Sequence, residues 1–236
     1  MTDKLQTESQ TQEESVKSTD ETQGINIEGH IKIFDPDSGD VYVDKKNAIH
    51  YENFSVALAK SIANRTTGFI EEMHFGNGGT TVDSTGVITY LTPNSSGDNA
   101  NLYNKTYYKS INDTSSLNTD TARNKITTAH VNGTTYTDVI VTALLDFGEP
   151  AGQSAFDNTT NVNDTYVFDE IGLFSWEGTA GTGNLLTHVI FHPVQKSLNR
   201  LIQIDYTIRI QSLTTFTETS STGASSSNIV SGTTGY

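Results

Sequence analysis

Cysteine is absent from the 236 residues. This absence excludes disulfide bonds, thiolate metal sites and a cysteine nucleophile, and it fits folding in a reducing cytoplasm. No apolar run is long enough to span a bilayer, and the first residues lack the apolar segment of a signal peptide. We therefore expect no membrane partner and no passage through the secretory route.

Basic residues are scarce. The chain has 14 Lys and Arg against 28 Asp and Glu, which gives a formal net charge of −14. Because this charge repels phosphate backbones, we expect no nucleic-acid partner. A local basic patch made of Lys196, Arg200 and Arg209 is an alternative, although such residues more often lie on the solvated face of a strand.

Apolar residues are scarce at both ends of the chain. Residues 1–24 are rich in Gln, Glu, Ser and Thr, and residues 214–236 are mostly Ser, Thr and Gly. Neither stretch carries enough apolar surface to offset its ordering entropy. We interpret them as an acidic N-terminal arm and a C-terminal arm that become ordered in an assembly, with the folded domain at residues 25–213.

The pattern between the arms is that of strands. Residues 198–210 alternate most clearly, which is typical of an antiparallel sheet with one buried face. Turn signals at residues 35–40 and at Asn132-Gly133 predict hairpins. A helix is expected near residues 53–65, with Asn53 as its N-cap, and residues 92–124 form a long polar loop. The predicted fold is mainly β: an antiparallel β-sandwich with one covering α-helix and extended N- and C-terminal arms.

Candidate catalytic and metal-binding groups do not form a site at the level of the sequence. His188 and His192 would lie about 13 Å apart on a strand, too far to share one zinc ion. Adjacent carboxylates such as Asp169 and Glu170 would point to opposite faces of a strand, so such a pair cannot flank a scissile bond. The turn at Asp35 lacks the Gly and Glu of a calcium loop. We expect no catalytic residue, no cofactor and no metal.

Glycines mark structural positions. We interpret six of them as turn or close-packing residues: Gly39, Gly76, Gly78, Gly79, Gly133 and Gly172.

Six segments occur in a characteristic order: Lys45–Ile49 (KKNAI) before the helix and Met73–Gly79 (MHFGNGG) after it, then Phe168–Phe174 (FDEIGLF), Leu185–Pro193 (LLTHVIFHP), Gln195–Ser197 (QKS) and Ile204–Ile210 (IDYTIRI). Over about residues 31–212 this order resembles small virion proteins of tailed bacteriophages, associated with the neck, collar, tail or fibre attachment. The resemblance implies a structural β-sandwich in an oligomeric particle and carries over no catalytic residue. Both arms lie outside it.

The expected function is therefore structural and non-enzymatic. Sheet edges, loops and arms would attach the chain to the neck or collar, the tail or the capsid surface of a virion assembled in the host cytoplasm. The expected partners are other copies of the chain, as a homo-oligomer, and other virion proteins of the neck, tail or capsid.

Two other functions stay open. A fibre-type adhesin would bind host-surface glycans through Tyr103, Tyr107 and Tyr108, although these tyrosines are better explained as packing a loop onto the core. A hydrolase would need carboxylates from distant segments to meet.

Overall fold

The computed structural model describes residues 21–97, 99–150, 165–197 and 199–216. Within these residues it contains one helix, α1 (Tyr51–Ile62), and eleven strands. The strands are β1 (Glu21–Phe34), β2 (Val41–Ile49), β3 (Ile70–Gly76), β4 (Thr80–Val82), β5 (Ile88–Tyr90), β6 (Lys105–Ser110), β7 (Lys125–His130), β8 (Tyr136–Leu145), β9 (Thr165–Ser175), β10 (Leu185–Ser197) and β11 (Ile202–Phe216). The predicted fold class, mainly antiparallel β with one helix, is confirmed.

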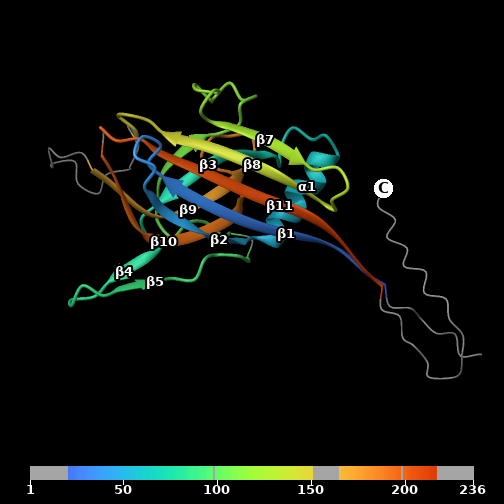
Figure 1. Cartoon of the computed structure of the whole chain (residues 1–236), viewed down its shortest axis with the longest axis horizontal. Coiled ribbons are helices and arrows are strands. Elements are labelled where there is room, and N and C mark those ends of the chain that lie inside the picture. Colours follow the sequence, from blue (N-terminus) through green and yellow to red (C-terminus); the bar gives the residue numbers. More distant parts are fainter. Residues whose placement is uncertain (1–20, 98, 151–164, 198, 217–236) are drawn as a thin grey trace, which may run out of the picture.

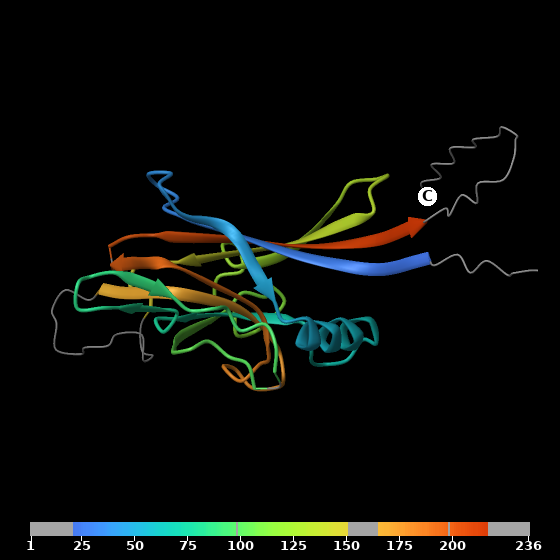
Figure 2. The ribbon, with the colours of Figure 1, turned by 90° about the horizontal axis from the view of Figure 1, so that it is seen from below.

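Nine strands form one antiparallel sheet in the order β6-β3-β9-β10-β2-β1-β11-β8-β7. Strand β2 pairs with β1 over most of its length, but with β10 only through Thr187↔Ile49 and His188↔Ala48. The sheet folds back on itself at this short junction, so its two halves face each other as the layers of a sandwich (Figure 2). Strands β4 and β5 form a separate hairpin that projects from the body (Figure 1).

The first layer, β2-β1-β11-β8-β7, has the alternation that the sequence predicts. Along β11, Ile204, Tyr206 and Ile208 are fully buried, and the residues between them are partly exposed. Their neighbours across the ladder include Ile33, paired with Ile204, and Ile31, paired with Tyr206. The period of two therefore builds one face of the core.

The second layer, β6-β3-β9-β10, is buried on both faces. This differs from the prediction, which gave the sheet only one buried face. In β3 every residue from Glu71 to Gly76 is buried. Met73 belongs to the main core, whereas His74 stacks on Phe174 at 3.7 Å between ring centroids, outside that core. Chain segments before β6 and between β9 and β10 pack on this outer face, so polar residues there are buried as well.

Strands β1 and β11 continue outside the sandwich as a two-stranded ribbon (Figure 2). Their pairing extends to Glu21↔Phe216. The residues next to the two predicted arm boundaries, 21–24 and 214–216, are therefore strand residues that pair with one another. The rest of each predicted arm lies outside the described residues.

Three predicted local features differ in detail. The helix spans Tyr51–Ile62, not residues 53–65, and its N-cap is His50 rather than Asn53. The His50 Nδ1 atom accepts the Asn53 backbone N–H at 3.3 Å. The predicted loop 92–124 contains strand β6, because residues 105–110 pair with β3 at the edge of the second layer.

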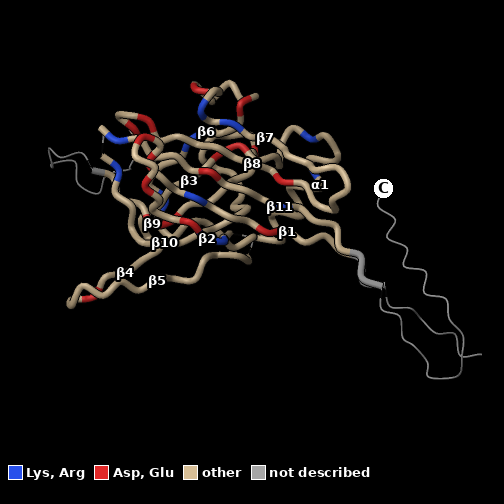
Figure 3. Tube along the Cα trace, viewed as in Figure 1, with Lys and Arg blue, Asp and Glu red and all other residues tan. Residues whose placement is uncertain are grey.

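Charged residues of both signs are interspersed over the body (Figure 3). The three basic residues considered as a patch do not form one. Arg209 makes two hydrogen bonds to Asp138 at 2.8 and 2.9 Å, and Arg200 lies 3.5 Å from Asp35. Lys196 is buried, with only 1% of its surface exposed, so it does not lie on a solvated face.

Candidate docking site

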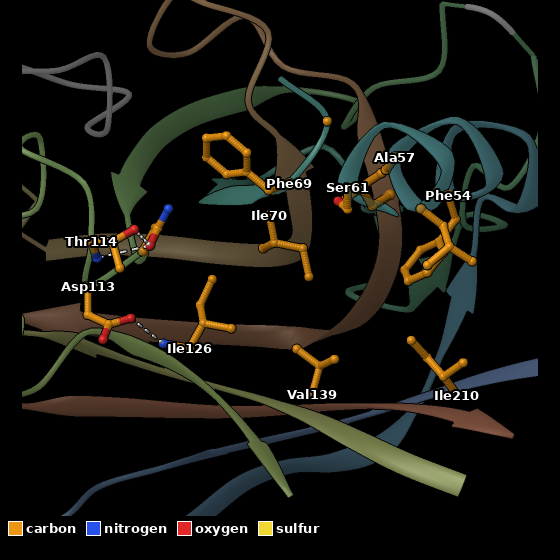
Figure 4. A pocket seen from close by; sticks show the side chains of 14 residues that line it. Phe54, Ala57, Ser61, Phe69, Ile70, Asp113, Thr114, Ile126, Val139 and Ile210 are labelled. Atoms are coloured by element: carbon orange, nitrogen blue, oxygen red, sulfur yellow. Dashed lines mark hydrogen bonds between the residues drawn. The ribbon is translucent and has the colours of Figure 1, made fainter. Parts of the chain in front are cut away.

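An apolar pocket of about 500 Å³ opens at the end of the sandwich that carries α1 (Figure 4). The two layers diverge here, and the helix fills only part of the gap with Phe54 and Ala57. The first layer contributes Ile126, Val139 and Ile210, which lie across the pocket from Ile70 and Phe54 in Figure 4. The pocket is therefore an unfilled continuation of the core.

The exposure of the lining supports this description. Six apolar residues of the lining are only half-buried: Leu58, Phe69, Ile70, Ile126, Val139 and Ile210. Next to the pocket, Ile62 at the end of α1 is 78% exposed. Covering these side chains would remove apolar surface from water, at roughly 25 cal/mol for each Å² buried.

Several polar groups on the rim of the pocket make hydrogen bonds within the chain. Asp113 accepts the Ile126 backbone N–H at 3.3 Å. Asn112 accepts the Thr114 backbone N–H at 3.0 Å and donates to Glu71 at 2.9 Å. Because these groups already have partners, an occupant would be selected by apolar contact rather than by hydrogen bonding.

The two adjacent carboxylates of β9 hold the loop that follows β3. Asp169 accepts the backbone N–H of Gly79 at 2.9 Å and of Thr80 at 2.8 Å, and Glu170 accepts the Gly78 N–H at 3.1 Å. Burial raises the pKa of Asp169, and the hydrogen bonds from the Thr80 hydroxyl and the two backbone N–H groups only partly oppose the rise.

Both carboxylates reach one loop because the β9–β10 ladder is irregular at this point. Phe168 pairs with Val194 and Glu170 with Ile190, so three residues of β10 lie opposite Asp169 alone. The core-facing positions of β9 change accordingly from Tyr166 and Phe168 to Ile171 and Leu173. The prediction that Asp169 and Glu170 point to opposite faces is therefore wrong, because a bulge interrupts the alternation.

Glu170 makes several hydrogen bonds on the outer face of the second layer. Besides Gly78, it accepts the backbone N–H groups of Tyr103 at 2.9 Å and Asn104 at 2.8 Å, and it contacts His188 Nε2 at 3.0 Å. Burial alone would raise the pKa of Glu170, but the hydrogen bonds from His188 and the two amides outweigh it and lower the pKa. The carboxylate is held ionised by structural contacts.

The other sequence candidates lie apart from one another. His188 is fully buried beside Glu170, whereas the ring of His192 lies 3.3 Å from the Tyr90 hydroxyl on the projecting hairpin. Among the described residues no group of three His, Cys, Asp or Glu side chains is arranged to hold a metal ion. His74 pairs with Glu72 at 2.7 Å, and burial lowers its pKa.

The glycines have different roles. Gly39 and Gly133 have φ of +80° and +86° in their hairpin turns, where glycine is the residue of least strain. Gly76 ends β3, and Gly78 and Gly79 lie in the loop that the carboxylates hold. Gly172 lies inside β9, where a Cβ atom would come within 2.7 Å of the Thr187 carbonyl oxygen. It is a close-packing position and not a turn.

The three tyrosines do not form one platform. Tyr107 is 6% exposed and packs on Phe75, so its ring offers no surface to a ligand. Tyr103 is 45% exposed, but its hydroxyl donates to the Thr92 carbonyl at 2.8 Å and its ring lies near His188. Tyr108 is half-buried against Gly181. Tyr103 and Tyr107 thus pack their segments onto the sheet.

Comparisons with protein-family models, with curated proteins and with solved structures found no match to this chain. In the described part of the chain, the only helix is too short to cross a membrane.

Proposed function

We propose that this protein is a structural, non-enzymatic subunit of a tailed-phage particle. It attaches to neighbouring subunits through the end of the sandwich that carries the apolar pocket and the β1–β11 ribbon. The phage assignment rests on the order of the six segments from Lys45 to Ile210. The mode of attachment rests on the geometry of this end of the molecule.

One observation carries the docking proposal: the core face of the sheet continues beyond the body without a cover. Ile210 lines the pocket and pairs with Ile27, which is buried. Two residues along the same face of β1, Ile25 is 60% exposed, and on the opposite face of the ribbon Leu213 is 43% exposed. Beside the pocket, the ribbon thus exposes an apolar side chain on each of its two faces, as an interface does.

The buried polar groups support a structural role. The Asp169 and Glu170 oxygens are engaged with backbone amides and with His188, so they hold loops in place. A glycan-binding role is the less favoured alternative, because Tyr107 lies in the core.

The test is association and incorporation. The wild-type chain is expected to form oligomers in analytical ultracentrifugation and to be found in purified particles. The double variant Ile25→Ser, Leu213→Ser should raise the dissociation constant of the oligomer about tenfold. Each substitution removes an exposed apolar side chain that would contact a neighbouring subunit.

The matched control is Val82→Ser. Val82 is 62% exposed on the β4–β5 hairpin, away from the ribbon, so its loss should leave association unchanged. A wild-type chain that stays monomeric at all concentrations and is absent from particles would refute the proposed function. Turnover of a host polysaccharide by the purified chain would refute its non-enzymatic part.

A further inference from the structure

The pocket beside α1 needs an apolar occupant without charge. Its apolar lining is half-buried, and the polar groups on its rim are already paired within the chain. A volume of about 500 Å³ lies within the usual range for binding pockets. It can take aliphatic side chains, whereas a charged side chain would lose hydration among the apolar side chains of the lining.

The sequence after β11 contains a segment of this chemistry. Among residues 217–236 the only charged residue is Glu218, and the only two large aliphatic residues next to each other are Ile229 and Val230. They are preceded by three serines and Asn228 and followed by Ser231 and Gly232. The pair can therefore enter an apolar pocket without burying a charge.

The position of β11 and the length of chain after it set how far this segment can reach. Strand β11 passes the pocket at Ile210 and runs six residues further to Phe216, or about 20 Å at 3.3 Å per residue. The ribbon leads it past α1 and away from the body (Figure 2). Ile229 follows Phe216 by 13 residues (229 − 216), which can span about 43 Å when extended.

We propose that the aliphatic pair Ile229–Val230 of one chain occupies the apolar pocket of a second copy. This inference rests on the proposed function and names the partner of the docking site. To return to its own pocket the chain would have to reverse at the ribbon tip, whereas a copy packed along the ribbon is reached without reversal. Two aliphatic side chains bind weakly on their own, and repetition over several copies makes such contacts firm.

The absence of cysteine allows a direct test on the full chain. One population carries Ser61→Cys, at an exposed position on the pocket rim, and a second carries Ser227→Cys, two residues before Ile229. After mixing and treatment with a short bismaleimide, we expect a covalent dimer whose cross-link joins residues 61 and 227 by mass spectrometry. A control population carries Thr81→Cys, which is exposed on the β4–β5 hairpin, in place of Ser61→Cys.

Two variants test the contact itself. Adding Ile229→Ser and Val230→Ser to the Ser227→Cys chain should lower the dimer yield about tenfold or more, because the aliphatic contact is lost. Adding Leu58→Glu to the Ser61→Cys chain places a charge on the rim and should lower the yield similarly. Unchanged thermal melting of both variants shows that the fold is intact.

The outcomes separate this inference from the proposed function. If wild-type chains associate but the 61–227 yield equals that of the Thr81 control, the inference is overturned and the proposed function stands. A third population carries Ser61→Cys and Ser227→Cys on the same chain. If the cross-link forms within these chains but not after mixing the two single-cysteine populations, the inference is also overturned, because the segment then fills its own pocket. Chains that do not associate at all overturn both.

Discussion

His188 and Glu170 form a fully buried pair on the outer face of the second layer, with His188 Nε2 3.0 Å from the carboxylate. The other ring nitrogen, Nδ1, accepts the Asn94 backbone N–H at 2.8 Å. An amide can only donate, so Nδ1 carries no proton and the proton of the neutral ring lies on Nε2, facing the carboxylate. The ring thereby fastens the segment before β6 to β9 and β10.

Glu170→Ala should strongly destabilise the protein. The change leaves the amides of Gly78, Tyr103 and Asn104 and the buried His188 ring without their acceptor. Such losses are not additive, and we expect the free energy of unfolding to fall by about 3–5 kcal/mol. Urea denaturation measures the change, and limited proteolysis should show earlier cleavage within residues 92–104.

Glu28→Ala is the matched control for that substitution. Glu28 pairs with Lys46 at 3.3 Å, but both side chains are largely exposed, so the pair adds little to stability. The expected change in the free energy of unfolding is small compared with that for Glu170→Ala. Equal losses for the two alanine variants would contradict the role given to Glu170.

Gly172→Ala should destabilise the sheet. The added methyl group would come within 2.7 Å of both the Thr187 carbonyl oxygen and the Leu185 Cδ1 atom. Overpacking of this kind costs about 1–3 kcal/mol. Gly24→Ala on the ribbon is the control, since no atom lies within 4 Å of its Cβ position. Thermal melting of the two variants should differ clearly, and equal melting temperatures would show that β9 can shift to accept the methyl group.

The sequence predicts the parts of the fold that depend on local pattern. Alternation at residues 202–210 places β11 with its core face correctly, and Gly39 and Gly133 mark two hairpins. The helix is predicted from its apolar spacing. Its N-cap is missed because His50 is a rare capping residue, and its imidazole can accept an amide proton only in the neutral form found here.

The features that are missed depend on contacts between distant segments. The bulge at Asp169 reverses the alternation of β9, and two adjacent acidic residues give no sign of it in the sequence. Strand β6 lies in a polar stretch and is defined by its pairing with β3. The pocket follows from the divergence of the two layers, which the apolar stripe of α1 cannot reveal. Only the structure shows that Phe54 is buried, Leu58 half-buried and Ile62 exposed.

Lys196 gives a prediction about pH. It is buried, its Nζ donates to the Ser197 carbonyl at 2.7 Å, and burial lowers its pKa from the ordinary 10.5 to about 8. Between these two values the unfolded chain binds more protons than the folded chain, so this group makes stability rise with pH from about 8 to 10.5. Below pH 8 the buried charge destabilises the fold by about 3 kcal/mol.

Lys196→Met removes that penalty while keeping a side chain of similar length. We expect the variant to unfold at a higher urea concentration than wild type at pH 7, and the difference to shrink steadily as the pH rises to 9.5. Buried tyrosines whose pKa is raised, Tyr166 and Tyr206, also affect stability at high pH, but they are present in both proteins and cancel in the difference. Lys46→Met, at a side chain that is 76% exposed, is the control and should give only a small difference from wild type. A Lys196→Met effect that is flat between pH 7 and 9.5 would mean that the ammonium group remains hydrated in the folded protein.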